Sequence, residues 1–259
     1  MLLLKKIINK ILGFLGYKIS KISAKKKPDL DYITQIFTEK LDPIIFDIGA
    51  NKGQSIERYK KMFENCYIHS FEPNIDEINN LENKYKDEKR LFLNNLAIGE
   101  KEEITSFNIN SISGHSSFLK VNPNTNWLKM RSKRIGVDPK NYTIKKVKTK
   151  LITLDKYAID NQIDNIDILK IDTQGYEDKV LLGAKNLIEK NKIKIIQLEL
   201  IFSQVYQKQL QIYDIEKILI PNKYKLFAIS NKGSLNEDVI FQSDFLYLSS
   251  DKYEKFNQK

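Results

Sequence analysis

The sequence predicts an α/β fold with a mostly parallel sheet, because apolar runs that precede acids alternate with helical patterns. The first run spans residues 44–48, and a loop bounded by Gly49 and Gly53 leads from it into a helical stretch. The second run, 66–71, ends in Glu72. Short apolar runs bounded by turn residues are typical of buried strands. A chain of 259 residues is long enough for one large domain of this type.

The loop after the first run is suited to a cofactor. Glycine at 49 lets the backbone turn tightly and approach a ligand, and amides at the start of the next helix can meet negative charge. A dinucleotide site has the pattern G-x-G-x-x-G, whereas this loop has only Gly49 and Gly53. Asp47 would lie beside a pyrophosphate, but it could accept hydrogen bonds from an ammonium group. The loop therefore favours S-adenosylmethionine over NAD, although glycine turns also occur without a ligand.

Glu72 strengthens the cofactor interpretation. It lies 19 residues after Gly53, and an acid about 20 residues beyond the glycine loop binds the ribose diol in folds of this kind. The alternative is that Glu72 only caps the following helix, but Asn74 could do that alone. Two acids at two consecutive buried strands are more specific than either acid by itself.

Polar residues fall at or near the ends of five successive predicted strands: Asp47, Glu72, Asn95, Asp172 and Glu199. Ligands of open α/β sheets bind at the carboxyl edge of the strands, and burying an unpaired carboxylate is costly. These residues therefore predict one shared ligand site. Asp172 and Glu199 could also hold a hard divalent cation, which takes oxygen ligands, but two carboxylates do not make a metal site and we predict none.

An insertion at about 102–152 is expected to lie over this site. Residues 102–109 and 142–152 alternate in polarity and could pair with each other, whereas 111–141 has no clear period. Long irregular stretches inside compact domains are usually functional, so we expect the insertion to contact the acceptor. The remaining chain predicts helices at 32–41, 54–63, 75–85, 153–161, 180–188 and 209–220, and strands at 91–95, 166–171, 194–198, 224–230 and 239–249.

Two residues are candidates for a catalytic base. His115 lies within the insertion, and an unperturbed imidazole titrates at ~6.5. The alternative is an ordinary histidine in a surface loop. Asp172, at the end of a buried strand, is the second candidate.

The charge of the chain is unevenly distributed. The net charge is +10, with eight lysines and no acid in residues 1–28, and ten basic residues but only Asp138 as an acid in residues 120–150. Each stretch is a candidate surface for an anionic partner, although solvated lysines would look the same. The single cysteine, Cys66, excludes a disulfide within the chain and suits a reducing cytoplasm.

The N-terminal residues 1–28 predict a basic amphipathic helix and a linker before a domain at 29–259. Apolar residues at steps of three and four make one helical face in 1–22, and five lysines interrupt the run. The run is therefore too polar for a transmembrane helix. The helix would lie on an anionic membrane, at its inner face, or pack against the domain.

Several motifs together resemble the FkbM-type methyltransferases. They are Asp47-Ile-Gly-Ala-Asn-Lys-Gly53, Phe71-Glu-Pro-Asn74, Asn95-Leu-Ala-Ile-Gly99, Leu169-Lys-Ile-Asp-Thr-Gln-Gly-Tyr-Glu177 and Gln242-Ser-Asp-Phe-Leu-Tyr247. The resemblance covers roughly 40–250. It implies a class I methyltransferase fold with a Rossmann-like seven-stranded sheet, and S-adenosylmethionine as cofactor. It further implies that Gly49, Ala50, Asn51 and Gly53 line the methionine part of the cofactor, that Glu72 lies at the ribose, and that Asn95 and Ala97 lie at the adenine. Pro73, which follows Glu72, is also expected to bind the cofactor.

The resemblance implies O-methylation of a sugar or related hydroxyl. With the basic stretch at 120–150, we expect an anionic glycan precursor, nucleotide- or lipid-linked, methylated in the cytoplasm during surface polysaccharide biosynthesis. One alternative is an RNA ribose methyltransferase, which the basic charge would suit. No two prolines are adjacent, which argues against base methylation and makes nucleic acid the less favoured partner. Another alternative is a non-catalytic membrane-surface module, which the intact glycine loop and Glu72 disfavour. The sequence predicts no oligomeric state.

Overall fold

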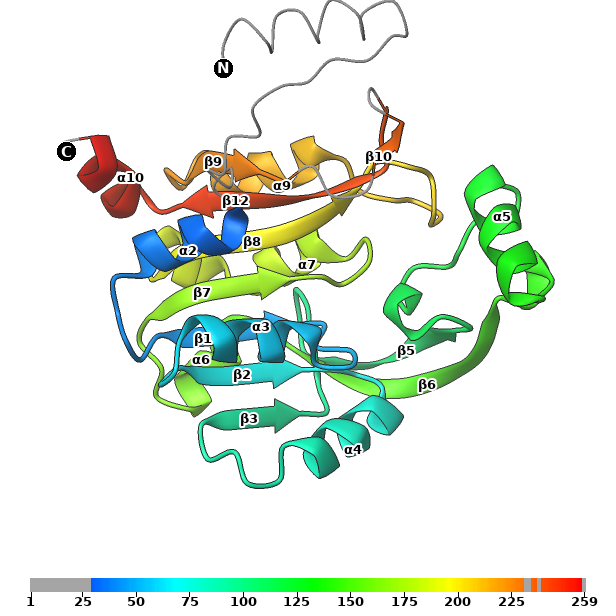
Figure 1. Ribbon diagram of the computed structural model, residues 1–259, viewed down its shortest axis with the longest axis horizontal. Helices are drawn as coiled ribbons and strands as arrows, with labels where there is room; N and C mark the ends of the chain where they lie inside the picture. Colours follow the sequence, from blue (N-terminus) through cyan, green and yellow to red (C-terminus); the bar gives the residue numbers. More distant parts are fainter. Residues whose placement is uncertain (1–28, 231–233, 237–238, 258–259) are drawn as a thin grey trace, which may run out of the picture.

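The computed structural model describes residues 29–230, 234–236 and 239–257, and its centre is a seven-stranded sheet (Figure 1). The strand order is β3-β2-β1-β7-β8-β12-β9. All neighbours are parallel except β12, which runs antiparallel to both β8 and β9. The predicted mostly parallel sheet is therefore confirmed. Its strands are β1 (Ile44–Ile48), β2 (Tyr67–Phe71), β3 (Leu91–Asn94), β7 (Ile166–Ile171), β8 (Ile193–Ile201), β9 (Lys225–Ile229) and β12 (Gln242–Leu248).

Helices cover both faces of the sheet because the central strands are apolar on both. Side chains alternate between the faces of a strand, so Phe46 and Ile48 of β1 enter one core cluster and Ile45 enters the other. The first cluster is closed by α6 (Leu154–Asp160), α7 (Glu177–Leu182), α8 (Lys185–Glu189) and α9 (Ile212–Leu219). The second is closed by α2 (Leu30–Thr38), α3 (Gln54–Met62), α4 (Ile75–Lys84) and α10 (Ser250–Asn257). Figure 1 shows α2 and α3 on the near side of the sheet.

The insertion forms a second sheet of its own. Its strands β4 (Ala97–Ile98), β5 (Glu103–Asn110) and β6 (Thr143–Ile152) lie in the order β4-β6-β5. β5 and β6 pair antiparallel, as the alternation of the two segments predicted. The expectation of an irregular stretch at 111–141 was wrong in part, because α5 (Asn126–Ile135) lies there between two short 3-10 helices, η1 (Ser113–His115) and η2 (Pro139–Asn141).

Three other sequence expectations need correction. Glu199 lies inside β8 rather than after it, because this strand continues in pairing with β12 as far as Ile201. The helix expected at 180–188 is divided into α7 and α8 around Gly183. The C-terminal helix α10 and the small pair β10 (Ser234–Asn236) and β11 (Val239–Ile240) were not expected as such.

The predicted N-terminal helix and linker, residues 1–28, lie outside the described residues. Among the residues that are described, none of the helices is long and apolar enough to cross a membrane.

Candidate active site

A pocket of about 260 Å³ lies at the carboxyl ends of β1, β2 and β7, beside the insertion. Its wall is apolar near β2, where Phe71, Leu96, Ala97, Ile98 and Phe107 line it. Its wall is polar near β7, where Gln54, Ser55, Lys170, Asp172 and Gln174 line it. The insertion contributes Phe107, Ser113, Gly114, Ser116 and Phe118 to the wall of this pocket. The pocket is thus divided into an apolar and a charged half.

The loop from Gly49 to Gly53 passes between β2 and β7. Gly49 has a φ of 89°, and a Cβ on it would lie 2.0 Å from the carbonyl oxygen of Asp172. The amides of Gly49 and Ala50 both donate to the carbonyl of Phe71, at 3.0 and 3.1 Å. Gly53, with a φ of 82°, is the N-cap residue of α3 and does not line the pocket, whereas Ala50 and Asn51 do. Glycine at 49 is required here because no side chain fits.

Glu72 lines the pocket as the sequence led us to expect. Its Oε2 accepts the amide of Asn51 and its Oε1 accepts the amide of Asn74, each at 2.9 Å. Burial raises its pKa to about 7, although these two backbone hydrogen bonds lower it. Asn74 caps α4 through the amide of Asp76 at 3.2 Å. The capping alternative for Glu72 therefore fails, because Asn74 has that role.

Asn95 and Ala97 occupy different places. Ala97 is buried and lines the apolar half of the pocket with the neighbouring Pro73. Asn95 is exposed, does not line the pocket, and donates from Nδ2 to the carbonyls of Glu72 and Pro73 at 3.0 and 3.2 Å. It therefore holds the Glu72 loop instead of facing a ligand, which corrects the sequence expectation.

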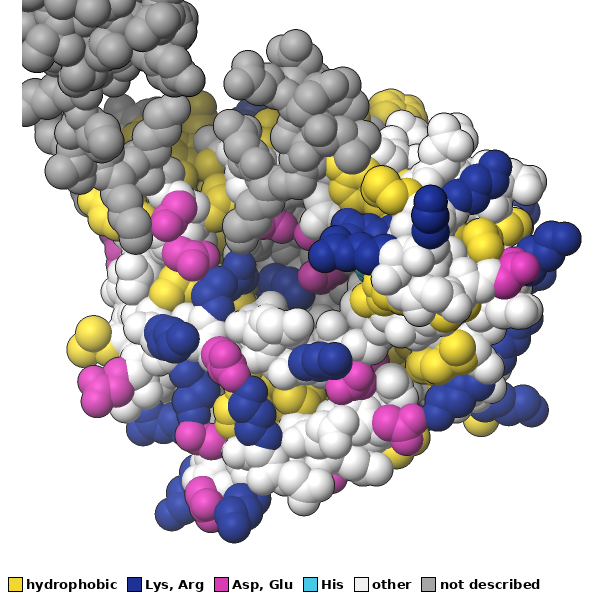
Figure 2. Space-filling view, turned by 45° about the vertical axis from the view of Figure 1, so that its right-hand side comes forward, with side chains coloured by type: hydrophobic (Ala, Val, Ile, Leu, Met, Phe, Trp, Pro, Cys, Tyr) yellow, Lys and Arg dark blue, Asp and Glu magenta, His cyan; other side chains and the backbone are white. Residues whose placement is uncertain are grey.

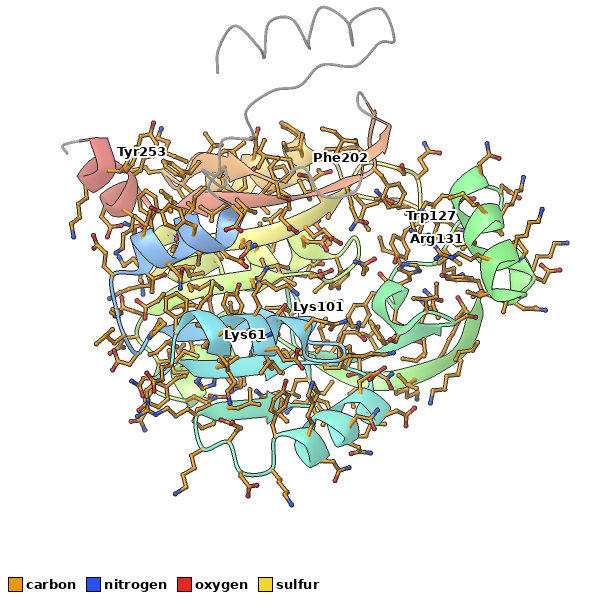
Figure 3. The ribbon with its side chains drawn as sticks, viewed as in Figure 1. Lys61, Lys101, Trp127, Arg131, Phe202 and Tyr253 are labelled. Carbon is orange, nitrogen blue, oxygen red and sulfur yellow. The ribbon has the colours of Figure 1, made fainter. Side chains whose placement is uncertain are left out.

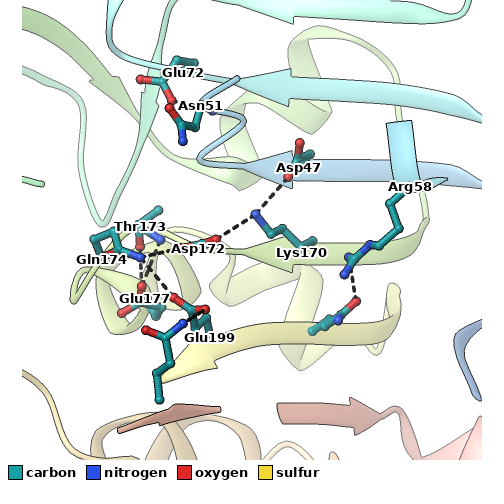
Figure 4. Close-up of polar contacts among 12 residues, drawn as sticks. Asp47, Asn51, Arg58, Glu72, Lys170, Asp172, Thr173, Gln174, Glu177 and Glu199 are labelled. Carbon is teal, nitrogen blue, oxygen red and sulfur yellow. Dashed lines mark hydrogen bonds and ion pairs between the residues drawn. The ribbon is translucent and has the colours of Figure 1, made fainter. Parts of the chain in front are cut away.

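Asp47 does not line the pocket either, although the sequence suggested a direct contact with the ligand. Its side chain is fully buried beneath the loop, and the ammonium of Lys170 lies 3.4 Å from its Oδ1 (Figure 4). The same ammonium lies 3.3 Å from Oδ2 of Asp172, which does line the pocket. Burial lowers the pKa of Lys170, but Asp172 and Asp47 outweigh it and the pKa is raised. The charged half of the pocket thus contains Asp172 and Lys170, and the buried carboxylate of Asp47 lies behind the Lys170 ammonium.

Glu199 and Asp172 are joined by the side-chain amide of Gln174. Gln174 donates from Nε2 to Asp172 at 2.9 Å and to Glu199 at 3.1 Å. Burial, with the charges of Asp172 and Asp244, raises the pKa of Glu199 to about 8. No group of three or more His, Cys, Asp or Glu residues within the described parts of the chain is placed to hold a metal ion.

His115 lies behind the pocket wall. Its Nδ1 is 2.6 Å from the hydroxyl of Tyr142, and its ring centroid is 5.0 Å from that of Trp127. Burial, assisted by the charge of Arg131, lowers its pKa to about 4. His115 is not among the residues that line the pocket, whereas its neighbours Gly114 and Ser116 are. The structure therefore brings Asp172, and not His115, to the pocket.

Sequence reasoning missed several lining residues. Lys170 is the most informative, because it stands in an apolar strand and a lysine is almost never fully buried without a partner. That signal could have identified it. Glu177, which does not line the pocket, also escaped notice. Its buried carboxylate fixes the loop after β7 by accepting the amides of Thr173 and Gly175 at 2.9 and 3.0 Å.

A seven-stranded sheet of this order, with a glycine loop after β1 and an acid after β2, defines a class I methyltransferase. The family model "Methyltransferase FkbM domain" matches residues 47–228. The chain therefore belongs to the FkbM methyltransferase family, as the sequence motifs had suggested, and it is a methyltransferase.

Individual relatives are distant. A curated relative, "2-O-methyltransferase NoeI" of Sinorhizobium fredii, is 24% identical over 189 residues, which are 70% of this chain and 72% of the relative. An rRNA methylase of Streptococcus thermophilus has a TM-score of 0.45 at 8% identity and covers 88% of this chain and 99% of its own. Magnesium protoporphyrin IX methyltransferase of Synechocystis PCC 6803 has a TM-score of 0.42 at 10% identity, covering 95% and 97%.

The pocket fits the methyl donor S-adenosylmethionine. Glu72 offers a carboxylate for a ribose diol, and Ala97 and Phe107 offer apolar walls for an adenine. Gly49 lets the loop lie in backbone contact with Asp172, which no larger residue would allow. The charged half of the pocket is left for the zwitterionic amino-acid end.

Proposed function

We propose that the protein transfers a methyl group from S-adenosylmethionine to a hydroxyl of a sugar or glycan precursor. The observation that carries the proposal is the divided pocket, with Glu72 in its apolar half and Asp172 in its charged half, next to the insertion. The family supports the methyl transfer, and the name of the relative, a 2-O-methyltransferase, supports an oxygen acceptor.

Asp172 is the base in this proposal. When bound, S-adenosylmethionine supplies an electrophilic methyl carbon with a neutral thioether as leaving group. The protein must align the acceptor oxygen with that carbon and remove the hydroxyl proton. The Asp172 carboxylate lines the pocket and would accept that proton. Lys170 and Gln174 fix its two oxygens at 3.3 and 2.9 Å. His115 would stabilise the packing of the insertion instead of accepting the proton, because its Nδ1 is hydrogen-bonded to the hydroxyl of Tyr142.

A second cavity, of about 730 Å³, supports a sugar as acceptor. It is lined by uncharged residues only: Asn122, Asn124, Thr125, Asn126, Trp127, Met130, Ser203, Gln204 and Phe241. Amide and hydroxyl groups match the hydroxyls of a sugar, and aromatic rings match the apolar face of its ring. The hydroxyl of Tyr206 donates to Oε1 of Gln174, which lines the first pocket, at 3.1 Å. Tyr206 also belongs to the same buried apolar cluster as Trp127 and Phe241, which line the second cavity.

Basic residues of the insertion support an anionic group on that acceptor. Lys133 and Arg134 follow the cavity-lining Met130 by three and four residues on α5, so they lie near it on the helix surface. Figure 2 shows Lys and Arg side chains spread over the right-hand part of the molecule. Figure 3 shows Trp127 and Arg131 on the side of α5 that faces the central sheet. A phosphate on a nucleotide-linked or lipid-linked sugar would be held there.

We place the reaction in the cytoplasm, before export of a surface polysaccharide. The single, buried and free Cys66 supports a reducing compartment. The lysines and apolar stripe in the sequence of residues 1–22 support attachment to the inner face of an anionic membrane.

The test is a transfer assay with purified protein and S-adenosylmethionine labelled on its methyl group. Phosphorylated sugar precursors and their dephosphorylated forms are compared as acceptors, with structured RNA as a third substrate. We expect label on the phosphorylated precursors. Label on RNA alone, or equal rates with and without the phosphate, would contradict the proposed acceptor.

A further inference from the structure

We propose that Lys170 binds the carboxylate of the amino-acid end of S-adenosylmethionine. This inference rests on the proposed function. In the reaction described above, Lys170 only fixes one oxygen of Asp172, and the inference gives it a direct contact with the cofactor. Lys170 lines the charged half of the pocket, although it is 9% exposed and stands within β7.

The order of the strands sets the direction of the cofactor. β1 lies between β2 and β7, so Glu72 and Lys170 approach the glycine loop from opposite sides. Neighbouring strands are ~4.8 Å apart, which separates the ends of β2 and β7 by roughly 10 Å. With the ribose at Glu72 and the adenine against Ala97 and Phe107, the amino-acid end must extend towards β7.

The chemistry of that end matches Lys170. A lysine ammonium has three N–H donors. Its two described partners are Asp172, at 3.3 Å, and Asp47, at 3.4 Å. One donor therefore remains for a ligand oxygen. The carboxylate of the cofactor's amino-acid end would accept a hydrogen bond from this donor, while Asp172 keeps its role as the base.

Lys170 is the only cation that lines this pocket among the described residues. The other groups near the amino-acid end are the side chains of Gln54 and Ser55 and the start of α3. These groups could hold a carboxylate through neutral donors, so the experiment must distinguish them from Lys170.

The experiment combines a change in the protein with a change in the ligand. Calorimetry measures the affinity of S-adenosylhomocysteine and of its decarboxylated form, S-adenosyl-3-thiopropylamine, for the full chain. The unmodified protein should bind S-adenosylhomocysteine about 10- to 100-fold more tightly, the value of a charge-assisted hydrogen bond. Lys170→Met should bind the two ligands within about threefold of each other. Lys179→Met, whose lysine pairs with Glu100 outside the pocket, should keep the full ratio.

The remaining outcomes would contradict either the role of Lys170 or the proposed function. A ratio near one for the unmodified protein, or an unchanged ratio in Lys170→Met, overturns the assignment, and the second result assigns the carboxylate to α3. If Lys170→Met does not fold because Asp47 is left unpaired, the double variant Asp47→Asn/Lys170→Met removes that buried charge. Failure of the unmodified protein to bind either ligand would instead contradict the proposed function.

Discussion

A Cβ atom on Gly49 would lie 2.0 Å from the carbonyl oxygen of Asp172. The cofactor loop and the end of β7 are therefore in backbone contact. Gly49→Ala should separate them, because L residues also avoid the φ of 89° found here.

We expect Gly49→Ala to weaken the binding of S-adenosylhomocysteine at least tenfold and to lower the melting temperature. Gly136→Ala is the matched control, because Gly136 also has a positive φ, 69°, but a Cβ added to it would meet no atom within 4 Å. Its cost should be limited to roughly 1 kcal/mol of backbone strain. Equal effects of the two changes on binding would contradict the close approach as the cause.

Glu72 should make cofactor binding depend on pH. Its pKa is raised to about 7, first by burial and also by the charges of Glu77 and Asp47, against two backbone hydrogen bonds. The ribose hydroxyls donate to the ionised carboxylate, so affinity for S-adenosylhomocysteine should rise between pH 6 and pH 8. Glu72→Gln should bind ~10- to 100-fold more weakly at pH 8 and lose this rise. A rise that persists in the variant would exclude Glu72 as its source.

The Glu72 carboxyl should make the stability of the folded protein fall as the pH rises, whereas it should make the affinity for the cofactor rise. Its folded-state pKa is above the ordinary 4.5. Its contribution therefore favours the folded state fully below pH 4.5 and is lost as the pH rises towards 7. Urea unfolding of the ligand-free protein at pH 5 and pH 8 should show a smaller difference in Glu72→Gln than in the unmodified protein.

Asp172 and His115 should differ in their effects on turnover. Asp172→Asn should lower kcat about 100-fold or more, since it removes the group that accepts the proton. His115→Asn should lower kcat less than tenfold, because the imidazole contacts Tyr142 and Trp127 and does not line the pocket. Steady-state kinetics of the two variants decides between them. A larger loss in His115→Asn would restore histidine as the base.

Charge reversal on α5 should change the KM of the acceptor and leave the affinity for the cofactor unchanged. The double change Lys133→Glu/Arg134→Glu should raise the KM of a phosphorylated acceptor, and the increase should shrink in high salt because both residues are exposed. Lys190→Glu/Lys192→Glu is the charge-matched control, because these residues precede β8 at the opposite edge of the sheet. If the control raises KM equally, the effect comes from net charge and not from this surface.

The core strands could be predicted because their patterns are local. β1, β2 and β7 are short apolar runs with turn residues after them, and the acids at their ends indicated the correct edge of the sheet. The positions of Asp47 and Lys170 could not be read in this way. They lie side by side in the register of β1 and β7, and pairing between strands that are far apart in the chain leaves no periodic trace in the sequence.

The helix α5 escaped prediction for a different reason. Its ten residues bury only Trp127, Leu128 and Ser132, so it has no apolar stripe at helical spacing. Its end signals were nevertheless present. Thr125 caps its first turn through the amide of Leu128 at 3.3 Å, and Gly136 ends it in the left-handed conformation. In this segment the capping residues predict the helix better than periodicity does.

The separate three-stranded sheet β4-β6-β5 has an evolutionary consequence. Its strands pair only with one another among the described strands, but Ala97 and Phe107 on this sheet line the cofactor pocket. The helix α5, which lies between β5 and β6, does not line that pocket. Residues of α5 can therefore diverge between descendants of one ancestor while the donor half stays constant. Exchanging residues 119–141 between two such enzymes is accordingly the natural way to obtain a transferase with a new acceptor.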